Sequence, residues 1–189
     1  MLIESILIAL FLVYITNGQW KNLFQFQFKK IYLPITGILV FLFLQLFTSV
    51  DFGKITDFCI NNFYYFHLLS ILLIIIGLLF NLELRSMYVI LLGFILNFIP
   101  LFVNGKMPVS IKALEKISNT KSYHIIMAGR SLSHGVFEHP KFFILSDIFP
   151  LPSPYYQPKI ISVGDILIHL GIILIILEIS RRKISGKNH

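Results

Sequence analysis

Long apolar runs alternate with short polar stretches along this chain, and that pattern predicts its fold class. Five runs are apolar enough for helices in lipid, and they cover approximately residues 2–15, 31–48, 63–82, 87–103 and 166–179. A helix needs roughly 20 apolar residues to cross the hydrocarbon core of a bilayer. The sequence therefore predicts an all-α, polytopic membrane protein of about five transmembrane helices, folded as a single membrane domain over residues 1–189.

The first run is the least typical span because it is short and contains Glu4. The polar turn before Trp20 has no small-residue cleavage site, which favours a retained membrane helix over a removed signal peptide.

Residues 104–160 form the one extended stretch whose pattern does not fit lipid. Their content of Ile, Phe and Pro is too high for a disordered linker, so we expect one long outer-face loop packed over the helix ends. Within it, Ser110 is expected to cap a short helix over residues 111–117, with Val109 and Leu114 in contact around the cap. Residues 118–135 are expected to be irregular. Prolines between residues 150 and 158 then exclude a regular helix until about Ser162.

Composition and charge support a membrane setting. Hydrophobic residues make up 56% of the chain and charged residues 13%, and the mean hydropathy is +0.81. The net charge is +7, but the basic residues lie beside apolar ends and form no uninterrupted basic arm, so the expected partner is a membrane lipid and no nucleic acid. Cys59 is the single cysteine, which excludes an intrachain disulfide and a multi-cysteine metal site.

Basic residues near the helix ends predict an orientation, because they are enriched in cytoplasmic loops. They follow the first, third and fifth runs, at Lys21, Lys29, Lys30, Arg85, Arg181, Arg182, Lys183 and Lys187. The N-terminus is therefore expected outside and the C-terminus in the cytoplasm. The long loop then lies outside, although it carries several lysines of its own.

Polar residues inside the predicted spans are the first candidates for function, since lipid excludes them. Gly93, Asn97, Pro100 and Asn104 recur at helical spacing on one face. This face is either a kinked packing surface or the wall of a polar cavity that opens outward.

The fifth run begins with a second candidate, Asp165. Ser162 is placed to cap this helix with Asp165 three residues later, which is a structural role. Alternatively, Asp165 faces Asn97 and Asn104 in a pocket that raises its pKa for acid or base chemistry. His169 lies one turn further on the same face and is an i,i+4 partner for the carboxylate.

The loop carries the remaining candidates. Asp147 lies among apolar residues, which is unusual for a solvated charge, and His134 is a candidate binding residue. His134 and His139 are five positions apart and no HExxH pattern is present, so we expect no metal site. No serine nucleophile elbow or phosphate-binding glycine loop can be identified, and we expect no cofactor.

Several motifs resemble those of bacterial integral membrane proteins that are grouped as a domain of unknown function. They span nearly the whole chain and include Asn104-Gly105-Lys106-Met107-Pro108-Val109-Ser110, the run Leu145 to Pro152 (LSDIFPLP), and Ser162-Val163-Gly164-Asp165. The resemblance implies a multipass fold in a bacterial cytoplasmic membrane and no particular activity.

The last helices are also similar to lipoprotein signal peptidase, whose two catalytic aspartates meet at the outer face. Asp165 matches the aspartate of its final helix. At the expected position of the other aspartate this chain has Asn104, so Asp147 would have to fold back from the loop to replace it.

These observations predict a membrane protein with an outer-face polar site that acts as a binding or accessory component for a lipid, a peptide or another membrane protein. Asn97, Asn104, His134 and His169 are its candidate binding residues. The alternative is a membrane-embedded aspartyl hydrolase with Asp147 and Asp165 as catalytic residues. A small transporter is a second alternative, disfavoured because the chain shows no internal repeat.

Overall fold

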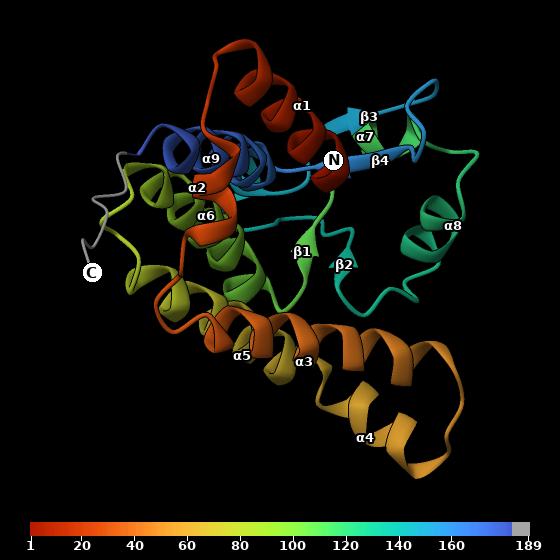
Figure 1. Cartoon of the computed structure of the whole chain (residues 1–189). Coiled ribbons are helices and arrows are strands. Elements are labelled where there is room, and N and C mark those ends of the chain that lie inside the picture. The colour runs from red at the N-terminus through yellow and green to blue at the C-terminus, as the bar shows by residue number, and fades with distance from the viewer. Residues whose placement is uncertain (183–189) are drawn as a thin grey trace.

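Helices that run between two ends of the molecule make up most of residues 1–182, which are the residues that the computed structural model describes (Figure 1). The long helices are α1 (Leu2–Ile15), α3 (Tyr32–Ser49), α5 (Phe63–Leu79), α6 (Arg85–Asn104) and α9 (Val163–Arg181). Two shorter ones are α2 (Trp20–Gln25) and α4 (Lys54–Asn61). Lys183 and Lys187 of the predicted basic tail lie outside the described residues.

The chain reverses direction between successive long helices, so each end gathers segments that are distant in sequence. The basic end holds residues 16–31, 80–85 and 181–182, and there the Gln19 amide donates to the Ser180 carbonyl at 2.9 Å. The loop end holds residues 104–162, and there Tyr155 Oη donates to Glu4 Oε1 at 2.6 Å. In Figure 1 the loop region lies toward the right.

Three helices, α3, α6 and α9, are long and apolar enough to cross a membrane, with 18, 20 and 19 residues. Helices α4 and α5 together form a fourth candidate span that is bent by 67°. Helix α1 is apolar but has 14 residues, which at ~1.5 Å per residue is shorter than a typical hydrocarbon core. The structure therefore shows a mostly helical protein with three to four candidate spans, and the fifth span at residues 2–15 rests on the sequence alone.

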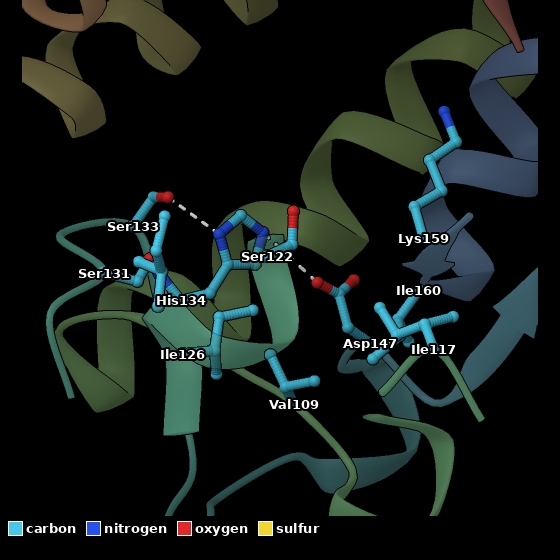
Figure 2. A pocket seen from close by; sticks show the side chains of 11 residues that line it. Val109, Ile117, Ser122, Ile126, Ser131, Ser133, His134, Asp147, Lys159 and Ile160 are labelled. Carbon is cyan, nitrogen blue, oxygen red and sulfur yellow. Dashed lines mark hydrogen bonds and ion pairs between the residues drawn. The ribbon is translucent and has the colours of Figure 1, made fainter. Parts of the chain in front are cut away.

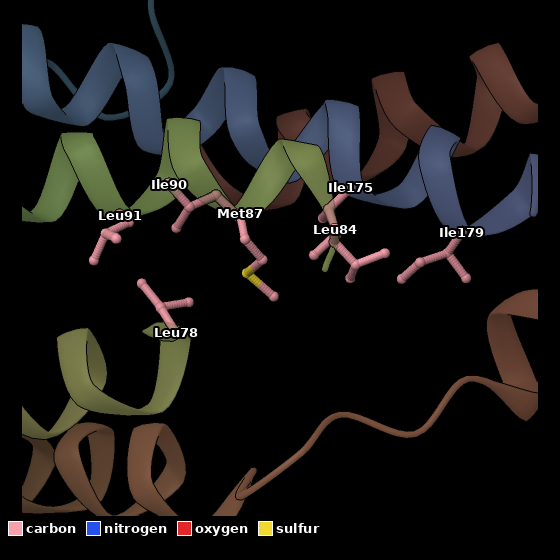
Figure 3. Close-up of a cluster of buried hydrophobic side chains, with 7 residues drawn as sticks. All are labelled: Leu78, Leu84, Met87, Ile90, Leu91, Ile175 and Ile179. Carbon is pink, nitrogen blue, oxygen red and sulfur yellow. The ribbon is translucent and has the colours of Figure 1, made fainter. Parts of the chain in front are cut away.

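The antiparallel helices α6 and α9 make a close backbone contact through glycine. A Cβ placed at Gly93 would lie 2.6 Å from the Gly164 carbonyl oxygen, so neither position accommodates a side chain. Contacts between small residues drive helix association in lipid, where apolar burial gives no advantage. Beside this contact, Figure 3 shows a buried cluster from α5, α6, α9 and the turn before α6, made of Leu78, Leu84, Met87, Ile90, Leu91, Ile175 and Ile179.

A carboxylate holds α6 and α9 together at the basic end as well. Glu178 on α9 accepts hydrogen bonds from the backbone amides of Arg85 and Ser86 at 3.0 and 2.9 Å, and from Ser86 Oγ at 2.6 Å. These amides are among the first of α6 and have no partner within the helix. The negative charge also lies at the positive end of the α6 dipole, which is favourable.

Helices α3 and α5 form a second antiparallel pair, seen along the bottom of Figure 1, with α4 at its loop end. Gly37 allows the close approach, since a Cβ there would lie 2.5 Å from the Ser70 carbonyl oxygen. Leu44, Cys59 and Phe63 form a buried cluster that fixes α4 against the pair.

The loop region packs on the helix ends and is ordered by two small sheets. Strand β1 (Met107–Pro108) pairs in parallel with β2 (His134–Gly135), and β3 (Phe149–Leu151) pairs antiparallel with β4 (Lys159–Ile161). Its short helices are α7 (Ile111–Glu115), α8 (Lys121–Met127) and the 3-10 turn η1 (Phe143–Leu145). The predicted all-α fold did not include these sheets. They could not be predicted because strands of two or three residues leave no periodic pattern in the sequence.

Part of the local structure of the loop was predicted and part was not. The cap at Ser110 is confirmed, because its Oγ accepts from the Ala113 amide at 3.4 Å, and Val109 and Leu114 share one buried cluster. The prediction of irregular chain over residues 118–135 is wrong for α8. There Thr120 Oγ1 accepts from the Tyr123 amide at 3.2 Å and caps a helix that the polar composition concealed.

Candidate functional site

Two cavities lie next to each other at the loop end, one within the loop region and one between the helices. The loop cavity has a volume of about 370 Å³ (Figure 2). The helix cavity has a volume of about 180 Å³ and reaches between α3, α5, α6 and α9. Both are lined by Ser133, His134, Asp147 and Ile160, so these four residues form a shared wall.

Asp147 is buried in this wall and fixed by its own main chain. Its amide donates to the Pro108 carbonyl at 3.0 Å, and its carbonyl accepts from the Ser110 amide at 2.9 Å. Asp147 is only 5% exposed. Asp147 lines the same helix cavity as Asp165.

His134 is the direct partner of Asp147 and belongs to β2. Its Nε2 lies 3.3 Å from Asp147 Oδ2, and its Nδ1 lies 2.7 Å from Ser133 Oγ (Figure 2). With the ring proton on Nε2, the imidazole donates to the carboxylate and accepts from the hydroxyl. The His134 side chain is 41% exposed, so the hydrogen-bonded series of Asp147, His134 and Ser133 is accessible from outside at His134.

The pair carries two shifted pKa values. Burial raises the pKa of Asp147 above its ordinary 3.8, with a smaller opposing effect from His134. Burial acts to lower the pKa of His134, but the hydrogen bond and negative charge of Asp147, with a contribution from Asp165, outweigh it and raise the pKa above 6.5. A histidine tuned in this way by a carboxylate is a common element of proton-transfer sites.

Asp165 lies at the start of α9, where it caps the helix and also faces Asn97. It forms a capping box with Ser162, in which the Ser162 amide donates to Asp165 Oδ2 at 3.1 Å and the Asp165 amide donates to Ser162 Oγ at 2.9 Å. Its other oxygen, Oδ1, accepts from Asn97 Nδ2 at 2.8 Å, and both side chains line the helix cavity. The Asp165 carboxylate therefore both caps α9 and lines the helix cavity.

The other two candidate binding residues do not line either cavity. Asn104 holds the loop to the end of α6, since it donates to the carbonyls of Pro100 and Lys141 at 2.7 and 2.9 Å. His169 Nδ1 lies 3.2 Å from Ser5 Oγ and so links α9 to α1 instead of bonding to Asp165.

Several residues of the cavities were not selected from the sequence, and three of them bear on the chemistry. They are Ser133, Lys159 and His67, the last contributed to the helix cavity by α5. The only signal for Ser133 is its position next to His134 in a loop that also contains Asp147. That signal becomes informative only when β1 and β2 pair and bring the three side chains together.

Within residues 1–182, no group of three or more His, Cys, Asp or Glu side chains is arranged to hold a metal ion. In comparisons with known proteins, a family model described as a family of unknown function matches residues 25–177. No curated protein and no solved structure matches the chain.

Proposed function

The chain belongs to the family of unknown function DUF5317, and because this membership assigns no activity, we propose a role from the geometry of the loop end. The protein binds an amphiphilic, lipid-like molecule in the loop and helix cavities. The polar centre of that molecule lies against Ser133, His134 and Asp147, and its apolar parts lie on the two sides of this wall.

The observation that supports this proposal is the shared wall itself. On its loop side the lining includes Val109, Ile117 and Ile126. On its helix side the lining includes Phe41, Ile71 and Leu101. A polar group between two apolar compartments is complementary to a molecule whose polar linkage separates apolar parts. The loop cavity of about 370 Å³ suits a small molecule or part of a lipid, since ligand pockets span roughly 300–1,000 Å³. The helix cavity of about 180 Å³ has room for only a part of such a ligand.

The proposal places the loop end on the outer side of a bacterial cytoplasmic membrane, with the N-terminus outside and the C-terminus in the cytoplasm. Basic residues that are enriched in cytoplasmic loops gather at the basic end, at Lys21, Lys29, Lys30, Arg85, Arg181 and Arg182. Lys159 in the loop cavity offers a cation to a phosphate or carboxylate headgroup.

A photoactivatable monoacylglycerol with a clickable chain tests the binding proposal. We expect ultraviolet crosslinks to the purified protein to map to α8 and to the end of α6. Ile126→Trp fills the loop cavity and should reduce crosslinking at least tenfold. Met127→Trp, one position later on α8 and 49% exposed, should leave it unchanged. Equal crosslinking of parent and Ile126→Trp would reject the proposal.

An aspartyl hydrolase is the second candidate, because Asp147 and Asp165 line the same helix cavity. Two carboxylates that share a proton can activate water for peptide hydrolysis. In the structure, however, the two carboxylates have different partners. Asp147 pairs with His134, and Asp165 accepts a hydrogen bond from Asn97. The aspartyl mechanism requires that Asp147→Asn and Asp165→Asn each abolish cleavage of a fluorogenic, lipid-anchored peptide, with the double variant no worse than either.

A further inference from the structure

We propose that Ser133, His134 and Asp147 form a hydrolytic relay in which Ser133 is the nucleophile toward a carboxylic ester of the bound amphiphile. The inference rests on the proposed function, because the bound molecule brings its ester to the shared wall. It goes beyond binding by assigning a reaction and a substrate class to this wall.

The geometry of the relay carries the inference. Ser133 Oγ lies 2.7 Å from His134 Nδ1, and His134 Nε2 lies 3.3 Å from Asp147 Oδ2, so one imidazole joins the hydroxyl to the carboxylate. This is the order of groups that activates serine in unrelated hydrolases, although the two ring nitrogens have exchanged roles. All three residues line both cavities.

The relay is held by backbone pairing and does not depend on flexible side chains alone. The Met107 amide donates to the Ser133 carbonyl at 2.8 Å, and the His134 amide donates to Ser131 Oγ at 3.1 Å. Asp147 is fixed from the other side through Pro108 and Ser110. Nucleophile, base and carboxylate therefore sit on adjoining segments of one small sheet region.

The reaction balances with water as the only co-reactant. Ser133 Oγ adds to the ester carbonyl carbon while its proton passes to His134 Nδ1, and Asp147 stabilises the imidazolium through Nε2. The carbonyl is restored as the bond from carbon to the alcohol oxygen breaks, and His134 returns the proton to that oxygen. Water, deprotonated by His134, then cleaves the acyl-Ser133 ester and releases a carboxylic acid with the serine restored.

The two cavities can hold the two parts of the ester that flank its carbonyl group. One compartment takes the acyl chain and the other takes the alcohol part, because both have apolar walls. The raised pKa of His134 supports the role of base. The charged and titratable groups that surround it are Asp147 and Asp165, with Lys159 in the loop cavity and His67 in the helix cavity.

An alkyl fluorophosphonate with a fluorescent reporter tests the nucleophile, since serine displaces its fluoride only when activated. We expect the purified full chain to be labelled at Ser133, as mapped by peptide mass spectrometry. Ser133→Ala should abolish labelling, and His134→Gln should slow it about 100-fold or more. Ser118→Ala, an exposed loop serine outside both cavities, should be labelled like the parent.

A second variant distinguishes the loss of the nucleophile from the loss of folding. Ser133→Cys keeps the size of the side chain and should react with iodoacetamide at least tenfold faster than Ser118→Cys, because His134 draws the proton from the thiol. Equal thiol rates together with no labelling of the parent would overturn the relay.

Asp147 is a positioning residue, and its test is a pH profile. Labelling of the parent should rise with pH through the raised pKa of His134. Asp147→Asn should move that midpoint to lower pH as well as slowing the reaction. An unchanged midpoint would exclude Asp147 from the relay.

Ester hydrolysis separates this inference from the binding proposal. We expect faster cleavage of p-nitrophenyl octanoate than of the acetate, and Ile126→Trp should remove the difference. If the photoactivatable monoacylglycerol crosslinks to α8 but Ser133 is not labelled and no ester is cleaved, binding stands and the relay is wrong. If crosslinking also fails, both are wrong.

Discussion

Asn97 Nδ2 donates to Asp165 Oδ1 at 2.8 Å, across 68 positions of sequence, and this bond ties α6 to the first turn of α9. Asn97 Oδ1 in turn accepts from Ser162 Oγ at 2.6 Å. The three side chains satisfy one another's hydrogen-bonding groups, which is how polar residues are accommodated in helices that are apolar enough to span a membrane.

Replacing Asn97 with leucine should therefore destabilise the fold modestly. The change leaves Asp165 Oδ1 and Ser162 Oγ without this partner, and hydrogen bonds within membrane proteins average below about 2 kcal/mol. We expect a loss of roughly 1–2 kcal/mol, measured by thermal unfolding in detergent. Asn61→Leu, at an exposed position of α4, is the control and should melt like the parent. A large loss in both variants would show that the effect is not specific to this contact.

The raised pKa of His134 predicts a direction for the pH dependence of stability. The folded state binds a proton more tightly than the unfolded state, so this contribution is complete below the ordinary value of 6.5 and is lost as pH rises through the raised value. Burial also raises the pKa of Asp147, which acts in the same direction. We expect the His134 ring resonances in NMR to titrate above pH 6.5.

The Asp147→Asn variant provides the comparison for that titration. Without the carboxylate, His134 loses the hydrogen bond and the negative charge that raise its pKa, so its midpoint should fall below that of the parent. Identical midpoints in the two proteins would mean that the two side chains are not coupled.

The glycine contact between α6 and α9 predicts a second effect on stability. In Gly93→Ala the new methyl group meets the Gly164 carbonyl oxygen at 2.6 Å unless the helices separate. Overpacking of this kind costs about 1–3 kcal/mol, visible as a lower melting temperature. Leu92→Ala, at a neighbouring position that is 48% exposed, should change the melting temperature little. A Gly93→Ala protein as stable as the parent would show that the helices separate without cost.

The proposed orientation can be tested by cysteine labelling in intact cells. In a Cys59→Ser background, Lys121→Cys at the loop end should react with a membrane-impermeant maleimide. Lys30→Cys at the basic end should react only after the membrane is permeabilised. The reverse pattern would invert the topology.

The sequence was most informative where a local rule decides the structure. Both serine caps follow from residue types at fixed spacing, and Ser110 and Ser162 form them as expected. The position of Asn97 and Asp165 in one cavity agrees with the expectation that both are too polar to face lipid.

The relay could not be predicted, because it depends on contacts between distant segments. Ser133 and His134 meet Asp147 only through the pairing of Met107 with His134 and the bridge between Val109 and Asp147. Such two-residue pairings have no periodicity. For the same reason, nothing in the sequence separates His134, which enters the site, from His169, which pairs with α1.

Two helix pairs, together with the loop region, supply the walls of the helix cavity. One is the α3–α5 pair, which supplies Phe41 and Ile71, and the other is the α6–α9 pair, which supplies Leu101 and Asp165. Close-packed helices resist deformation individually, but they can rotate as units against each other. A change in the angle between the two pairs would therefore change the width of the cavity. We expect a change in bilayer thickness that tilts one pair relative to the other to alter the affinity for the proposed ligand, so that the thickness of the surrounding lipid would regulate the site.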